Sequence, residues 1–227
     1  IDKKKTRIKF VVEFQFKSLA LVIIDEQHKF GVKQREKITS SYSKQPHLIY
    51  MSATPIPRTL ALVLYENMNY ITIYDKPSER KAVDTKIFSD KDREIIISRV
   101  HKHLEEGMQV YWVCTRVEDT FDEDRQSINI FSDKLKKSFP KHRISILHGR
   151  ISSEEKIRII NDFKCGSIDI LVATSVIEVG IDCPNANCLI IENSELFGLA
   201  QLHQLRGRVG RGSIKGHCYL TYSFKSK

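Results

Sequence analysis

Features that mark a membrane, exported or disulfide-linked protein are missing from this chain of 227 residues. No apolar run is long enough to span a bilayer, so we expect a soluble protein with no membrane association. The basic start at residues 1–7 is followed by no signal-peptide core, so nothing indicates export and we expect a cytoplasmic location. The 5 cysteines are odd in number and scattered, which fits neither a disulfide framework nor paired zinc ligands. We expect them to be reduced packing residues.

The sequence also lacks the pattern Gly-x-x-x-x-Gly-Lys-Ser/Thr, whose backbone and lysine hold the β- and γ-phosphates of a nucleotide. Internal repeats and low-complexity tracts are absent as well. What remains is a chain with 41% hydrophobic residues, enough for one large or two modest domains with a real core.

Charge is not balanced, because 37 Lys and Arg stand against 28 Asp and Glu, a formal net charge of +9. Residues 1–80 hold 14 basic and 8 acidic side chains, and residues 81–227 hold 23 and 20. A basic chain favours a polyanionic partner, since neutralised phosphates release their counterions. Basicity alone does not identify that partner.

An unbroken apolar run at residues 19–24 predicts a strand buried on both faces of a parallel sheet. Asp25 and Glu26 follow it at once, where open α/β sheets bind their ligands. A carboxylate pair there can hold Mg²⁺ and orient a water molecule. An Asp-Glu pair at a strand end is also common by chance, so this pair alone decides nothing.

The chain between residues 47 and 84 predicts the end of a first domain. A strand at 47–51 runs into a turn with two prolines, and a short helix at 59–65 and a strand at 69–74 follow. Residues 75–84 have almost no apolar content, so we place a domain boundary there.

The remaining sequence alternates strand and helix patterns. Apolar runs predict strands at 109–114, 144–147, 168–173, 188–191 and 216–222. Helices are predicted at 91–106, with Ile95, Ile96, Val100 and Leu104 at helical spacing and a stop at Gly107, and at 124–138. A third helix has a capping box at Ser152 and Glu155 and is expected to bury Ile157, Ile160 and Phe163. This alternation predicts an α/β fold with a doubly wound parallel sheet.

Residues 201–211 form a basic run with Arg206, Arg208 and Arg211. Its start has Leu199, Leu202 and Leu205 at a three-residue spacing, which predicts an anchored helix. Gly207 and Gly210 would let a ligand or backbone come close, so the guanidiniums suit an anion site. The alternative is a solvated basic face.

Three other features favour plain structural roles. His101 and His103 point to different sides of a helix, so a solvated face is a better interpretation than a metal site. Cys183 and Cys188 lack an adjacent basic helix start, which argues against a redox pair. Tyr111 and Trp112 stand between valines in a strand, so core packing is preferred to stacking on a base.

Four ordered motifs resemble those of superfamily 2 helicases. They are Asp25-Glu-Gln-His28, Ser52-Ala-Thr54, Thr174-Ser-Val-Ile-Glu-Val-Gly-Ile-Asp182 and Gln204-Leu-Arg-Gly-Arg-Val-Gly-Arg211. The longer strings around them look like the RecG family of bacterial branched-DNA translocases. The transcription-repair coupling factors are a close second, but they usually have Glu in place of Gln27 and Tyr in place of His203.

The resemblance implies a RecA-like fold of the P-loop NTPase type and a particular division of the chain. Residues 1–75 would be the C-terminal part of a first RecA-like domain, 76–84 a linker, and 85–227 a second RecA-like domain. The phosphate loop and the wedge domain of the family are not in this sequence. We therefore expect the chain by itself to have no ATPase activity.

The resemblance also implies roles in ATP hydrolysis. Asp25 would bind Mg²⁺ and Glu26 would polarise the attacking water, while Gln27 and His28 would link the nucleotide and DNA sites. Ser52 and Thr54 would couple the two sites.

In the second domain, Gly180 and Asp182 would approach the nucleotide and Thr174 a DNA phosphate. Gln204, Arg208 and Arg211 would reach the triphosphate across a cleft between the domains, with Arg208 and Arg211 as arginine fingers. Arg206 would be structural.

The function implied is the motor of an ATP-dependent, monomeric DNA helicase that remodels branched DNA, such as replication forks and Holliday junctions, in recombination and repair. Two alternatives stay open: a noncatalytic nucleic-acid-binding module, and an interaction domain with vestigial motifs. Intact acids and arginines argue against the second, because a domain without nucleotide chemistry does not need both.

Overall fold

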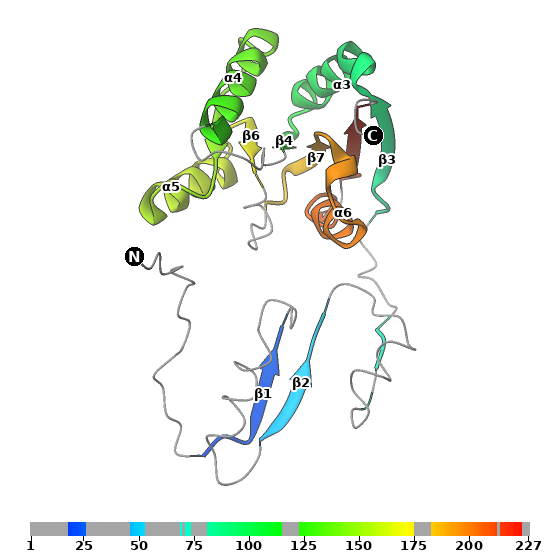
Figure 1. Cartoon of the computed structure of the whole chain (residues 1–227), viewed down its shortest axis with the longest axis vertical. Coiled ribbons are helices and arrows are strands. Elements are labelled where there is room, and N and C mark those ends of the chain that lie inside the picture. Colours follow the sequence, from blue (N-terminus) through cyan, green and yellow to red (C-terminus); the bar gives the residue numbers. More distant parts are fainter. Residues whose placement is uncertain are drawn as a thin grey trace, which may run out of the picture. The chain divides into compact units, whose positions relative to one another are not determined.

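The structure is a computed structural model that describes residues 18–25, 46–52, 69, 71–73, 81–114, 123–174, 183–212 and 214–223. The chain divides into two compact units, Ile1–Asn67 and Met68–Lys227, which are described separately (Figure 1). The expected linker at 76–84 falls within the second unit by this division and stays a prediction.

The first unit contains a parallel pair of strands, β1 (Leu21–Ile24) and β2 (His47–Tyr50), so the two predicted strands are confirmed. The predicted burial of the first strand on both faces is wrong, because Leu21 and Ile23 are 47% and 56% exposed. Ile24 is paired with Tyr50, and the Met51 amide donates to the Ile24 carbonyl (2.8 Å). The helix expected at 59–65 lies outside the described residues.

The strand expected at 69–74 is not found in its described residues, 69 and 71–73. Ile71 and Ile73 are 83% and 86% exposed. No described strand is paired with this segment, and an alternating pattern without a hydrogen-bonded neighbour forms no ladder.

The second unit is built on a six-stranded sheet in which every neighbouring pair is parallel. Its strand order is β3-β8-β7-β4-β6-β5. The strands are β3 (Asp84–Ser89), β4 (Gln109–Val113), β5 (Ile144–Leu147), β6 (Ile170–Ala173), β7 (Ala186–Ile191) and β8 (His217–Tyr222). The predicted doubly wound parallel sheet is therefore confirmed, with β3 as a strand that the sequence pattern missed.

Helices α3 (Arg93–Glu105), α4 (Glu123–Ser138), α5 (Ser153–Lys164) and α6 (Leu199–Arg206) connect these strands. Helix α3 is followed by Gly107 at φ +80°, the left-handed conformation that glycine adopts at no steric cost. Helix α5 begins after Ser152, whose Oγ accepts a hydrogen bond from the Glu155 amide (3.1 Å).

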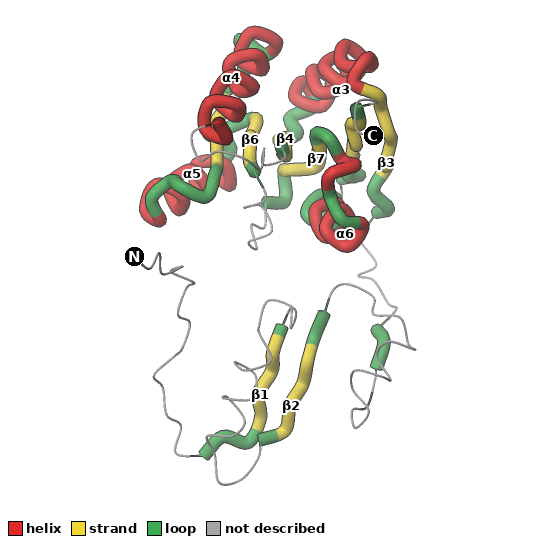
Figure 2. The backbone as a smooth tube through the Cα atoms, in the orientation of Figure 1, coloured by secondary structure: helices red, strands yellow, loops and turns green. Residues whose placement is uncertain are grey.

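The helices cover both faces of the sheet (Figure 2). Ile96, Val100 and Phe139 of the α3–α4 side pack with Val110 and Trp112. Successive residues of a strand point to opposite faces, so the neighbouring Tyr111 and Val113 belong to the other core, with Phe163 of α5 and Leu205 of α6. Tyr111 and Trp112 are fully buried, which confirms their predicted packing role.

Two predicted anchors are wrong, since Ile157 is 59% exposed and Leu199 is 86% exposed. Each lies six residues before a fully buried residue of the same helix, Phe163 and Leu205. At about 100° per residue, six residues rotate a side chain by about 240°, so a three-residue spacing drifts off the buried face. In α5, Ile160 packs against the core that contains Phe163, as expected, and Ile159 does so in place of Ile157.

The cysteines are free, but they are not all packing residues. Cys183, Cys188 and Cys218 are buried and Cys114 is partly buried, whereas Cys165 is exposed. The expectation of interior packing is therefore wrong for Cys165.

Candidate functional site

The first unit brings two predicted site residues to one edge of its strand pair. Asp25 follows β1 directly, and Ser52 stands two residues after β2. The pairing of Ile24 with Tyr50 places both at the carboxyl ends of parallel strands. The partner residues Glu26, Gln27, His28 and Thr54 lie outside the described residues.

Asp25 is exposed, and its carboxylate oxygens are donors of the kind that Mg²⁺ prefers. Across the described parts of the chain, no group of three or more His, Cys, Asp and Glu could hold a metal ion on its own. A cation at Asp25 would therefore need further oxygen ligands from elsewhere, such as a nucleotide.

Thr174 lies at the carboxyl edge of the second unit's sheet, directly after β6. Its amide donates to the Leu147 carbonyl at the end of β5 (3.3 Å). The side chain is buried, with 7% of the residue exposed, and Oγ1 has no hydrogen-bond partner among the described residues. A buried hydroxyl without a partner costs about 1–3 kcal/mol, which a bound phosphate oxygen would offset.

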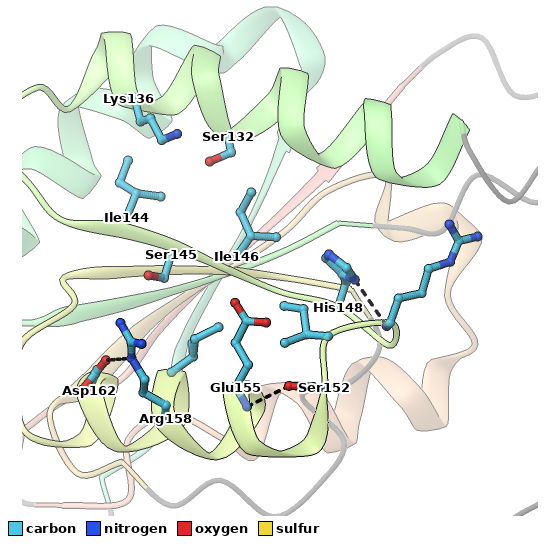
Figure 3. A pocket seen from close by; sticks show the side chains of 13 residues that line it. Ser132, Lys136, Ile144, Ser145, Ile146, His148, Ser152, Glu155, Arg158 and Asp162 are labelled. Carbon is cyan, nitrogen blue, oxygen red and sulfur yellow. Dashed lines mark hydrogen bonds and ion pairs between the residues drawn. The ribbon is translucent and has the colours of Figure 1, made fainter.

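A polar loop after β5 lies beside Thr174, because β5 and β6 are neighbours. The Arg150 amide donates to His148 Nδ1 (3.3 Å), and Lys156 Nζ donates to the Gly149 carbonyl (2.7 Å). His148 and Arg150 also line an open groove over the free edge of β5, between α4 and α5 (Figure 3). Sequence reasoning did not identify these residues as functional, although His148-Gly149-Arg150 directly follows a predicted strand.

The arginine run extends from α6 into the loop before β8. Leu205 and Val209 are fully buried and anchor it. Arg211 is exposed, and its Nε donates to the Gly207 carbonyl (3.2 Å). Arg206 Nη2 lies 3.1 Å from His203 Nδ1, in agreement with a structural role. Gln204 and Arg208 are half-buried on the same segment.

The loop is held closely at the amino edge of the sheet. Gly210 has φ +66°, and a Cβ there would lie 3.2 Å from the Gly216 amide and 3.3 Å from Val83 Cγ2. Gly216 and Val83 immediately precede β8 and β3. Packing thus fixes the backbone of this loop, while the Arg211 side chain itself is exposed.

The predicted site residues of the second unit do not gather at one point. Thr174 lies at the carboxyl edge of the sheet, whereas Gln204, Arg208 and Arg211 lie on α6 and the loop that leads to the amino edge. Gly180 and Asp182 lie outside the described residues. The described candidate residues of this unit therefore lie toward opposite ends of the sheet's strands.

A buried carboxylate organises the carboxyl edge. Glu192, directly after β7, accepts hydrogen bonds from Arg93, from Trp112 Nε1 (2.6 Å) and from Thr221 Oγ1 (2.9 Å). The Arg93 guanidinium also lies 5.4 Å from the centre of the Trp112 ring and 5.1 Å from that of Phe131. This network ties β4, β7 and β8 to α3.

The histidines of α3 differ from the expectation of a solvated face. His103 is buried at 6% exposure, and its Nε2 lies 2.7 Å from the Tyr219 hydroxyl. The His103 and His217 rings stack with centroids 4.3 Å apart. His103 therefore belongs to the packing between α3 and β8.

Comparison with known proteins gives a consistent result. The family model "Helicase conserved C-terminal domain" matches residues 91–213. ATP-dependent DNA helicase RecG of Escherichia coli K12 is 47% identical over 217 residues, which cover 94% of this chain and 31% of the relative. RecG of Treponema pallidum is 42% identical over 223 residues, covering 96% of this chain and 32% of the relative. The chain thus spans about a third of the length of these curated relatives.

Solved structures support the RecA-like helicase fold. A structure of RecG bound to a three-way DNA junction matches with a TM-score of 0.72 and 39% identity, covering 93% of this chain and 27% of that chain. Mycobacterium smegmatis helicase Lhr, bound to single-stranded DNA and AMP-PNP, matches with a TM-score of 0.64 at 20% identity, covering 89% of this chain and 28% of that chain, and shows the fold alone. Among the described residues, no helix has the length and apolar character required to cross a membrane.

Proposed function

Because the chain belongs to the family of the helicase conserved C-terminal domain, we propose that it forms the motor portion of an ATP-dependent DNA helicase of the RecG type. The substrate would be branched duplex DNA, remodelled during recombination and repair. The observation that carries the proposal is the anchored arginine run. Buried Leu205 and Val209, with the tight loop at Gly210, anchor the backbone that carries these arginines, and such preorganisation favours transition-state stabilisation.

The amino edge of the second unit would serve the nucleotide. Arg208 and Arg211 would neutralise charge on the γ-phosphoryl group as arginine fingers, and Gln204 would contact the triphosphate. Gly180 and Asp182 would complete this contact.

In the first unit, Asp25 would hold Mg²⁺ and Glu26 would orient the attacking water. The ion would neutralise phosphate charge when bound with ATP. Gln27 and His28 would link the nucleotide to the DNA.

The carboxyl edge would serve the DNA. The unpaired Thr174 hydroxyl suits a phosphate oxygen, and the loop at His148 and Arg150 adds basic groups beside it. Ser52 and Thr54 would couple DNA contact to hydrolysis.

A chimera tests this proposal. The matching 217-residue segment of Escherichia coli RecG would be replaced by this chain, and DNA-stimulated ATPase and fork remodelling would be measured. We expect activity in the chimera and a loss of about 10³-fold in kcat for Arg211→Ala. Arg211→Lys should stay defective, since lysine keeps the charge but lacks the planar fork.

The matched control is Arg206→Lys, which changes an arginine that contacts His203 within α6. Nucleotide affinity and melting temperature should change little in either variant. Near-normal kcat in Arg211→Lys would remove Arg211 from the catalytic residues. A folded chimera that binds DNA without hydrolysing ATP would instead favour the noncatalytic nucleic-acid-binding module.

A further inference from the structure

The end of α4 and the turn into β5 concentrate positive charge. Residues 134–143 contain five Lys and Arg and no Asp or Glu, and we call them the basic corner. Residues 81–227 as a whole hold 23 basic and 20 acidic side chains, a net of +3. The basic corner contributes +5, so the rest of this part of the chain is slightly acidic. The charge is localised rather than spread for solubility.

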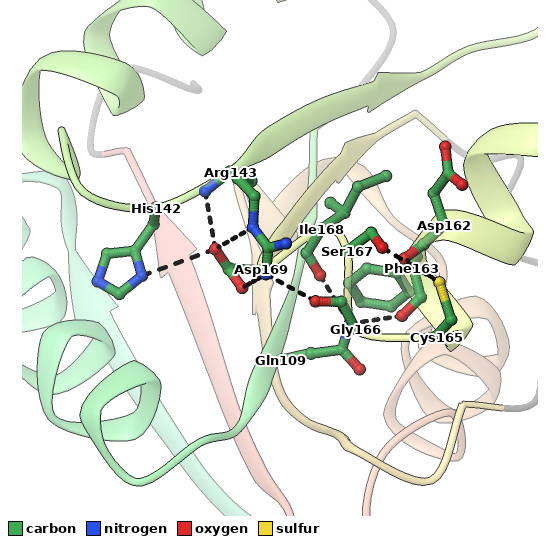
Figure 4. Close-up of polar contacts among 10 residues, drawn as sticks. All are labelled: Gln109, His142, Arg143, Asp162, Phe163, Cys165, Gly166, Ser167, Ile168 and Asp169. Atoms are coloured by element: carbon green, nitrogen blue, oxygen red, sulfur yellow. Dashed lines mark hydrogen bonds and ion pairs between the residues drawn. The ribbon is translucent and has the colours of Figure 1, made fainter.

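Some cations of the basic corner have structural partners. Arg143 donates to Asp169 through its backbone amide (2.8 Å) and Nη2 (2.9 Å), and Nη2 also donates to the Gly166 carbonyl (2.7 Å; Figure 4). Burial opposes ionisation of Asp169, but the hydrogen bonds from Arg143 keep the pKa of this carboxyl below its ordinary value. Lys136 Nζ lies 3.1 Å from Asp133. The Arg143 contacts hold the start of β5 to the loop before β6, and the Lys136–Asp133 pair lies within α4.

Three lysines have no such role. Lys134, Lys137 and Lys141 are exposed and make no side-chain hydrogen bond or ion pair with the described residues. Lys134 and Lys137 lie three residues apart on α4, about 4.5 Å along its axis. Lys141 lies in the turn after the helix, where the His142 amide donates to the Phe139 carbonyl (3.1 Å).

Offsetting the helix dipole does not account for all three. Positive charge in the last turn of a helix contributes about 0.3–1 kcal/mol, and Lys136 and Lys137 already occupy that turn of α4. Lys134 lies before the last turn and Lys141 beyond the helix. Three unpaired like charges close together repel one another, and a polyanion would relieve this repulsion.

We propose that Lys134, Lys137 and Lys141 bind the phosphodiester backbone of a DNA arm. This rests on the proposed function in taking DNA as the substrate, and it adds a contact at the amino end of β5, away from Thr174. Phosphates of one strand follow one another at about 3.4 Å along the duplex axis, so the three lysines can contact phosphates that are close in sequence.

The path between the two contacts follows the free edge of the sheet. β5 is the last strand in the order, and its four residues span about 13 Å. The residues that line the groove over this edge include Arg150, three residues after β5, and Lys136 of the basic corner. Its middle is closer to neutral, because Arg158 is paired with Asp162 (3.8 Å) and Glu155 also lines it. DNA would thus be held at the two ends.

Salt-dependent binding of the 227-residue chain to a labelled 30-base-pair duplex and to a 30-nucleotide single strand tests the proposal. The variant is Lys134→Gln/Lys137→Gln/Lys141→Gln. The control is Lys81→Gln/Lys86→Gln/Lys215→Gln, which removes the same charge at the β3–β8 end of the sheet. Each lost phosphate contact lowers the slope of log K against log salt by about 0.9 on duplex and about 0.7 on single strands.

We expect the variant to lower the duplex slope by about 2 to 3 and the affinity at 100 mM salt by more than tenfold, with less than one unit of slope change in the control. Equal effects of the two triple variants would show a general charge effect and overturn the proposal. Unchanged DNA binding would also overturn it and favour an acidic protein partner. A wild-type chain that binds neither DNA at 50 mM salt would contradict the proposed function as well.

Two further measurements distinguish a lost DNA contact from misfolding of the variant. Lys134→Arg/Lys137→Arg/Lys141→Arg keeps the charges and should bind within about threefold of wild type. On the unmodified chain, bound DNA should protect these three lysines from acetylation, while Lys81, Lys86 and Lys215 stay reactive. If DNA leaves the acetylation of both sets of lysines unchanged, the proposed contact is refuted, and this test needs no substitution.

Discussion

Glu192 shows how one residue supports the carboxyl edge of the sheet. Its carboxylate is 14% exposed and accepts hydrogen bonds from Arg93, Trp112 and Thr221. Glu192→Ala would leave the Arg93 charge and the Trp112 N–H without their acceptor in a poorly solvated place. Breaking a buried pair in this way costs about 3–5 kcal/mol, and partial exposure favours the lower figure.

We therefore expect Glu192→Ala to lower the free energy of unfolding by about 3 kcal/mol in urea titrations. Trp112 is the single tryptophan of the chain and contacts Glu192 directly, so its fluorescence reports the transition. The control is Glu195→Ala, an exposed carboxylate that accepts one hydrogen bond from the Ser223 amide (3.1 Å). If Glu192→Ala lowers the free energy of unfolding no more than Glu195→Ala does, the hydrogen-bond network around Glu192 contributes little to stability.

The stacked His103 and His217 predict a pH dependence of stability. Burial, and then the neighbouring His217, lowers the pKa of His103, and burial lowers the pKa of His217. Glu106 and Asp84 oppose these shifts, while Lys102, Lys215 and Lys86 reinforce them. Burial also raises the pKa of Tyr219 to about 12, so its hydroxyl remains a neutral partner for His103.

A histidine with a lowered folded-state pKa binds its proton more readily in the unfolded chain. Stability is therefore full above about pH 6.5 and falls as the pH drops from there toward the folded-state pKa values. We expect the melting temperature to fall between pH 7.5 and 5.5, and His217→Phe, which keeps a stacked ring, to reduce that fall. The exposed His203, changed to Gln, is the control. An identical fall in all three proteins would exclude the pair as the cause.

At the scale of elements, the close approach of Gly210 and Gly216 fixes the arginine loop against β8. A Cβ on Gly216 would lie 2.8 Å from the Gly210 amide nitrogen and 2.9 Å from its Cα, which backbone atoms cannot accommodate without moving. We expect Gly216→Ala to destabilise the second unit by about 2 kcal/mol or more and to displace the loop that holds Arg211. Gly212→Ala is the control, because a Cβ there meets only the Pro184 carbonyl at 4.0 Å.

Thermal melts and hydrogen exchange at the amides of β8 measure this effect. Gly216→Ala should melt lower and exchange faster at His217 and Cys218, whereas Gly212→Ala should resemble wild type. Equal behaviour of the two variants would mean that the loop is not packed as tightly as the contacts indicate.

Strands buried on both faces were predictable from the sequence, whereas one of the two edge strands, β3, was not. Every residue of β4, β6 and β7 is buried, so each appears as an apolar run. β3 lies at one end of the sheet and mixes Asp84, Thr85 and Lys86 with apolar residues, so its start was included in the polar segment assigned to the boundary. The other edge strand, β5, was predicted because three of its four residues are apolar.

The site was predictable as a set of motif residues but not as a spatial arrangement. Resemblance identified Thr174 and Arg211, yet the strand order and the crossover through α6 separate them to opposite edges. The sequence did not indicate the loop at His148 and Arg150 as part of the candidate site, because only its position beside Thr174 suggests a role for it. That adjacency comes from β5 and β6 being neighbours in space, which a three-residue motif does not indicate.

At the scale of the whole molecule, the second unit contains what a stable domain requires. Its sheet has six hydrogen-bonded strands, and two separate clusters of buried residues fill the spaces beneath the helices on each face. The described strands of the first unit are only two, and Leu21, Ile23 and Ile49 are about half exposed on them. An isolated pair of strands is marginally stable in water, so we expect the two units to differ in stability.

Limited proteolysis tests this difference and the position of the boundary. Trypsin should cut first at Arg80 or Lys81, where the sequence is polar. The fragment that starts there should persist, because trypsin reaches its β4, β6 and β7 only after the sheet unfolds. Mass spectrometry of a time course identifies the cuts, and Arg80→Gln/Lys81→Gln should delay release of the fragment without changing its later decay. If the C-terminal part disappears as fast as the N-terminal part, the boundary at 76–84 is wrong and the second unit depends on the first for its stability.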